Sequence, residues 1–95
     1  MDELIKELEN EWESEQGFFG KLRMSGFDKQ GFARVEALLK KVDSTADAYP
    51  RRLVSLVWFI PLFMSWQEVP NLSNEEYEDY SNRLENLVIE TLGVP

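Results

Sequence analysis

The chain has 95 residues and a formal net charge of −8, and 43% of its residues are hydrophobic. A chain of this length is typical of a single domain, residues 1–95, with one modest hydrophobic core. It contains no cysteine and no histidine, which excludes disulfides, thiol nucleophiles and metal sites built from those residues.

The first predicted helix begins at position 2 or 3. Its apolar residues recur at helical spacing within one narrow arc: Leu4, Ile5, Leu8 and Trp12. Phe19 and Leu22 continue this arc, which favours one long helix. Because glycine costs about 1 kcal/mol in a helix interior, a break near Gly17 is an equal alternative. We expect the neighbouring pair Phe18 and Phe19 to be less easily buried whole.

Asp28 is predicted to cap a second helix, because its carboxylate can accept hydrogen bonds from the first unpaired backbone N–H groups. The apolar face of this helix has five members: Phe32, Val35, Leu38, Leu39 and Val42. A connector over 43–49 follows. Pro50 then suits the first position of the next helix, where its missing N–H costs nothing.

A third helix is predicted from Arg51 to Trp66, a segment that is apolar nearly all the way round. A buried strand is the competing interpretation, but the segment is longer than a usual strand. Pro61 is expected to kink the helix. We expect this segment to be the central helix, and its aromatic residues to fill the core: Trp58, Phe59, Phe63 and Trp66.

Ser73 and Glu76 form a capping box, so the last helix is predicted to start near Asn74. Its apolar side chains share one face: Tyr77, Tyr80, Leu84, Leu87, Val88 and Leu92. The predicted fold class is therefore all-α, a compact bundle of four to five helices around a central apolar helix.

The acidic residues gather at the two ends of the chain. Residues 1–15 carry seven acids against Lys6, and residues 68–90 carry seven against Arg83. Residues 16–67 hold four acids and eight bases. We expect these central bases to pair with the acidic ends within the fold, and Arg83 to neutralise part of the charge of Asp79, one helical turn away.

The acidic faces of the first and last helices are the main functional candidates. Like charges one turn apart destabilise a helix by tenths of a kcal/mol, so uncompensated acids indicate a surface kept for a basic partner. Ordinary solvated faces are the alternative. The predicted partner-binding residues are five acids and one exposed aromatic anchor: Glu75, Glu78, Asp79, Glu11, Glu13 and Tyr49.

The sequence contains few kinds of side chain that could act in catalysis. The acid–base groups that remain are carboxylates, lysine and tyrosine, and no carboxylate pair stands in an apolar setting that would separate two pKa values. The sequence has no phosphate-binding glycine loop, nucleophile elbow or metal-binding motif. It therefore predicts neither an enzyme nor a cofactor or metal site. The net charge opposes binding to nucleic acid or anionic lipid.

The longest apolar stretch, Leu53–Met64, is shorter than the roughly 20 residues of a membrane span. The N-terminal residues lack the basic and apolar regions of a signal peptide. We expect a soluble cytoplasmic protein that has no membrane partner.

In size and acidity the whole chain resembles the immunity proteins of bacterial toxin–immunity pairs, and the resemblance extends to the run PRRLVSLVWFIPLFMSW (Pro50–Trp66) and the ending ETLGVP. It implies an inhibitor that covers the active or nucleic-acid-binding surface of a cognate basic, nuclease-type toxin, and it assigns no site residues. The alternative is a helical adaptor or regulatory subunit that binds a protein through an apolar groove. The aromatic content would also suit a homodimer.

Overall fold

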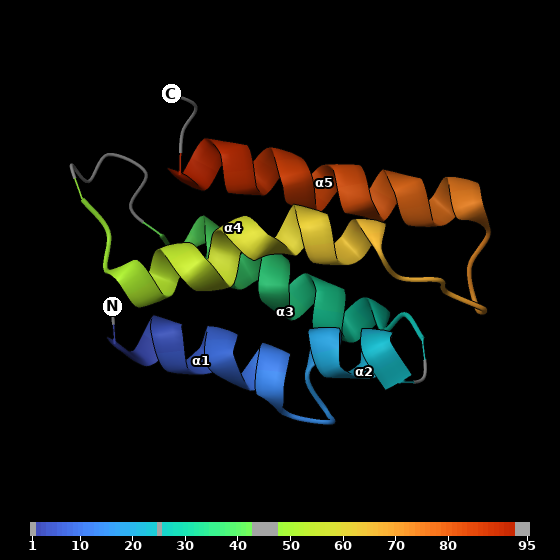
Figure 1. Cartoon of the computed structure of the whole chain (residues 1–95), viewed down its shortest axis with the longest axis horizontal. Coiled ribbons are helices and arrows are strands. Elements are labelled where there is room, and N and C mark those ends of the chain that lie inside the picture. The colour runs from blue at the N-terminus through green and yellow to red at the C-terminus, as the bar shows by residue number, and fades with distance from the viewer. Residues whose placement is uncertain (1, 25, 43–47, 93–95) are drawn as a thin grey trace.

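The computed structural model describes residues 2–24, 26–42 and 48–92. These residues form five α-helices and no strand, which confirms the all-α prediction (Figure 1). The helices, in chain order, are α1 (Asp2–Glu13), α2 (Phe18–Met24), α3 (Lys29–Lys40), α4 (Arg51–Ser65) and α5 (Asn74–Leu92).

Four of the helices form a ring in which each packs against the next, in the order α1, α3, α5, α4 and back to α1. The short α2 packs against α1 and α3. In Figure 1, α5 runs along one side of α4 and α1 along the other. The helix expected at the centre of the bundle is thus flanked on two sides, and its outward face remains open.

The core takes most of its apolar residues from the faces that periodicity predicts. All five predicted residues of the α3 face are buried, and α4 buries six side chains: Leu53, Leu56, Val57, Ile60, Phe63 and Met64. The prediction that Trp58 and Trp66 fill the core is wrong, because 52% and 62% of their surfaces are exposed. A domain this small has too few helices to enclose a 15-residue helix on every side.

The chain breaks between α1 and α2 instead of continuing as one long helix. At Gly17 the backbone passes so close to α1 that an added Cβ would lie 2.5 Å from the carbonyl oxygens of Asn10 and Glu11. This close approach requires glycine. It also brings α2 tightly against the end of α1, so Phe18 and Phe19 are fully buried. The expectation that this pair would be harder to bury is wrong.

Local sequence signals position the starts of α3 and α5 correctly. The Asp28 side chain accepts a hydrogen bond from the Gln30 N–H at 3.2 Å, as predicted for a cap. Burial disfavours its charged form, but hydrogen bonds from Lys21 and two backbone N–H groups lower the pKa of Asp28. At α5, the Ser73 hydroxyl accepts from the Glu76 N–H and donates to the Glu76 carboxylate, both at 3.1 Å.

Candidate binding surface

The acidic residues of α5 lie on its outer surface. Among the described residues, no lysine or arginine nitrogen lies within 4.0 Å of any acid between positions 68 and 90. The members of this set that lie on α5 are all exposed, and we call them the α5 acidic face: Glu75, Glu76, Glu78, Asp79, Glu85 and Glu90. Three of the predicted partner-binding residues therefore lie together on an exposed surface that the fold does not neutralise.

The sequence predicts that Arg83 neutralises part of the charge of Asp79, but in the structure it does not. Its guanidinium contacts α3 instead, where it lies 2.8 Å from the Glu36 carboxylate. It also lies over the Phe32 ring, 4.9 Å from its centroid, and over the Tyr80 ring. The base within the C-terminal acidic segment is thus committed to packing α5 on α3, and the α5 acidic face keeps its full charge.

Glu11 was predicted to bind a partner, but only 4% of its surface is exposed. Its carboxylate accepts a hydrogen bond from the Phe18 N–H at 2.8 Å, and so caps the first turn of α2. It also forms a two-pronged ion pair with Arg34 of α3, with N···O distances of 2.8 and 3.2 Å. The hydrogen bonding between the two side chains raises the pKa of Arg34. Glu11 is a structural joint between three helices.

The remaining acids of α1 are partly neutralised by α4. The Arg52 guanidinium lies 2.9 Å from the Glu9 carboxylate and 3.4 Å from that of Glu13, whose side chain is 70% exposed. Glu13 therefore remains accessible, as predicted, but it already has a cation beside it. The expected pairing of central bases with acidic ends holds for α1, through Arg34 and Arg52, and fails for α5.

Tyr49 is not the exposed anchor that the sequence suggested. Its ring packs against the hydrophobic core, and its hydroxyl donates to the Thr91 carbonyl oxygen at 2.9 Å. This hydrogen bond ties the segment before α4 to the end of α5. The position of Tyr49 therefore indicates a structural role.

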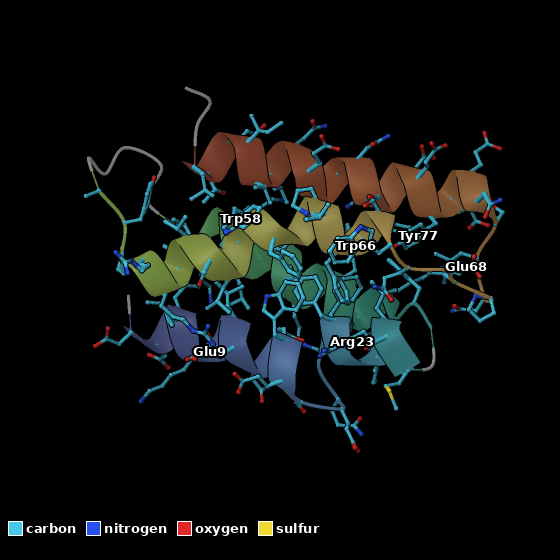
Figure 2. The ribbon with its side chains drawn as sticks, viewed as in Figure 1. Glu9, Arg23, Trp58, Trp66, Glu68 and Tyr77 are labelled. Atoms are coloured by element: carbon cyan, nitrogen blue, oxygen red, sulfur yellow. The ribbon has the colours of Figure 1, made fainter. Side chains whose placement is uncertain are left out.

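Two exposed aromatic residues are Trp58 on α4 and Trp66, the C-terminal cap of that helix, where sequence reasoning placed core residues. Trp58 and Trp66 follow each other at four-residue steps through Leu62, which is 41% exposed, so the three share one face of the helix. Figure 2 shows both tryptophans, with Glu9 on α1 and Glu68 beyond the end of α4. One signal could have revealed this face, because the polar Arg51 and Ser55 continue it toward the start of α4.

Tyr77 joins α5 to the end of α4, and its environment predicts a loss of stability at high pH. The hydroxyl donates to the Met64 carbonyl oxygen at 2.6 Å, and burial raises the pKa of Tyr77 to about 12. Tyrosine in an unfolded chain ionises near pH 10. Between about pH 10 and 12 the unfolded chain releases a proton that the folded chain keeps, so stability should fall as pH rises.

Urea denaturation midpoints at a series of pH values would check this expectation. Tyr77→Phe removes the titrating group, so the decline above about pH 10 should become shallower in the variant. When the folded variant is titrated, its tyrosinate absorbance should also lack the ionisation step that occurs at the highest pH in the wild-type protein. An equally steep decline in both proteins would show that Tyr77 is not its source.

No family model, no curated protein and no solved structure matches this chain. Within the described part of the chain, no group of three or more acidic side chains is arranged to hold a metal ion. None of the five helices in the described residues is long and apolar enough to cross a membrane.

Proposed function

We propose that this chain is a protein-binding domain that uses the α5 acidic face to bind a basic protein. The observation that carries the proposal is the absence of any cation within ion-pair distance of these acids in the described residues. Acids one turn apart, such as Glu75 and Asp79, repel each other at a cost of tenths of a kcal/mol per pair. A basic partner would remove this repulsion.

The contrast with α1 supports this choice of surface. The fold provides Arg34 and Arg52 for the acids of α1, whereas Arg83, on α5 itself, turns toward Glu36 of α3. A cluster of charges of one sign on a protein surface attracts oppositely charged partners over distances of about 10 Å, the screening length in roughly 0.1 M salt. The α5 acidic face is therefore the part of this molecule best suited to steer a basic protein.

Within this class, the partner we propose is a basic, nuclease-type toxin, and the chain would act as its immunity protein in the cytoplasm. A nuclease presents lysine and arginine side chains to the phosphates of its substrate. An acidic helix face of the size of α5 can occupy such a surface and exclude the nucleic acid. The support for this class is the charge complementarity together with the small size of the domain.

A triple charge reversal on α5 tests the proposal. The partner would first be identified by affinity purification from the native host, and association rates would then be measured by stopped flow. Glu75→Lys, Glu78→Lys and Asp79→Lys together should slow association by about tenfold or more at low salt. An unchanged rate would remove α5 from the interface.

A matched control separates the local surface from the total charge. Glu3→Lys, Glu7→Lys and Glu15→Lys change the net charge equally but alter exposed residues outside α5. This control should slow association much less than the α5 variant. Equal slowing by both variants would mean that only the overall charge matters and that α5 is not the docking surface.

The alternative function is a helical adaptor that binds a protein through apolar contacts, and the exposed Trp58 and Trp66 favour it. Ionic strength distinguishes the two functions. Binding through charges weakens as salt screens them, whereas binding through an apolar surface changes little.

A further inference from the structure

Trp58, Leu62 and Trp66 form a continuous apolar stripe along the outward face of α4, which we call the α4 stripe. Small soluble proteins rarely expose large aromatic side chains in a row, and such patches mark interaction sites. We infer that the α4 stripe is the docking surface for an amphipathic segment of the basic partner, one whose apolar side chains are flanked by lysine or arginine. This inference rests on the proposed function and adds an apolar contact to it.

The two tryptophans are held in place before any partner binds. The half-buried Phe59 lies edge-on between them, with ring centroids 5.9 Å from Trp58 and 5.6 Å from Trp66. Phe59 in turn contacts the ring of Phe63, which belongs to the core, and the ring of Trp12, which packs against the core. Because these side chains are already ordered, binding would cost little conformational entropy. Tryptophan is also among the residues that most often dominate binding energy.

Acidic side chains border the stripe on two sides. On the side of α5, Glu78 and Ser65 line one hollow of about 500 Å³ at the end of α4. Glu68 follows Trp66 by two residues and is exposed (Figure 2). On the side of α1, Glu9 and Glu13 lie against Arg52. Because Glu9 and Glu13 already pair with Arg52, the carboxylates that a docked segment would meet unpaired are Glu68 and Glu78 at the end of α4, which select lysine and arginine there.

Arg51 continues the line of the stripe at the start of α4, is exposed, and has no acid of the described residues within 4.0 Å. The other arginines near the stripe, Arg52 and Arg23, already have contacts of their own. Arg23 of α2 lies beside Phe63, whose ring contacts Phe59 beneath the stripe. Its guanidinium donates to the Trp12 carbonyl oxygen and lies over the Phe63 ring. Its contacts attach α2 to the rest of the bundle. At the end of α4, away from Arg51, the unpaired Glu68 and Glu78 therefore set the charge that an incoming segment meets.

The same charges disfavour two other occupants. A second copy of the chain would bring a second charge of −8 against the first, and the acids beside the two stripes would face each other. An anionic membrane would be repelled in the same way. A basic amphipathic segment satisfies both the apolar stripe and its acidic margins, so it is the occupant that fits.

The test uses two synthetic peptides and the full chain. One peptide is a helix of about 18 leucine and lysine residues with the leucines on one face. The other has the same composition with the leucines spread around the helix. Binding of each is measured with the wild-type chain and with the double variant Trp58→Ala, Trp66→Ala. Because both tryptophans are exposed, the variant should keep its fold, which circular dichroism checks.

The amphipathic peptide should bind the wild-type chain and shift its tryptophan emission to shorter wavelength. The double variant should bind that peptide about tenfold more weakly or worse, and its remaining Trp12 should show no shift. Met24→Ala, which truncates an 81% exposed side chain on α2 outside the stripe, is the matched control and should leave binding unchanged. The scrambled peptide should bind both proteins equally.

Three results would overturn the inference. One is equal binding of the amphipathic peptide by the wild-type chain and the double variant. Another is a sedimenting dimer that the double variant abolishes, because the occupant would then be a second copy. The third is binding of the wild-type chain to uncharged phosphatidylcholine vesicles through the same tryptophans. The α5 charge reversal should weaken the binding of both peptides. If it does not, while the double tryptophan variant still weakens binding of the amphipathic peptide, only the proposed function of the α5 acidic face is rejected.

Discussion

Replacing Phe19 with alanine should lower the free energy of unfolding by about 3–5 kcal/mol, the usual cost of removing a fully buried phenylalanine. The Phe19 ring stacks on Trp12 with a centroid distance of 3.9 Å and meets Phe63 edge-on at 5.7 Å. It therefore joins α2 to both α1 and α4. Domains of this size are stable by about 5–15 kcal/mol, so the variant should be close to unfolding, as urea denaturation would measure.

Trp66→Ala provides the matched comparison, because it also removes an aromatic ring but from an exposed position. It should lower the free energy of unfolding by about 1 kcal/mol or less. If both substitutions had similar effects, α2 would not contribute to the core in the way the packing of Phe19 indicates.

Glu11→Ala should cost about 2–3 kcal/mol, although it removes a charge from a protein that already has too many acids. The substitution leaves the Phe18 N–H without its acceptor and Arg34 without its partner, and unsatisfied groups near the core are expensive. Because the side chain of Arg34 is 46% exposed, solvent compensates part of the loss. This moderates the full penalty of a buried ion pair.

Glu7→Ala on the exposed surface of the same helix is the control, and it should change stability by about 0.5 kcal/mol or less. Glu11→Gln keeps an oxygen that can accept from the Phe18 N–H, so its effect should fall between the two. Thermal and urea denaturation of the three variants would check this order. Equal stability of the Glu11 and Glu7 variants would contradict the role of Glu11 as a joint between helices.

The sequence predicts most of the fold because the information for it is local. Helical spacing identifies the buried faces of α3 and α5, and the caps at Asp28 and Ser73 locate their starts. The break after α1 remained open, because Gly17 is compatible with either a costly helix interior or a turn. The close passage of the backbone beside Asn10, a tertiary contact, decides between them.

The candidate site is less predictable because it depends on contacts between distant residues. Glu11 lies at the rim of the α1 face by periodicity, and its burial depends on Arg34, 23 residues later in the chain. The exposure of Trp58 and Trp66 depends on where the neighbouring helices pack. Because α4 is apolar nearly all the way round, its sequence does not show which side those helices leave uncovered. Glu75, Glu78 and Asp79 could be placed correctly because exposure of an acidic helix face is the default.

The uncompensated charge of α5 links binding to thermal stability. Because its acids repel one another in the free chain, the folded state carries an electrostatic penalty that dissolved cations lessen. A bound basic protein would remove that penalty and would also shift the folding equilibrium by mass action. The melting temperature of this domain should therefore depend on the salt concentration and on a bound partner as well as on the packing of its core.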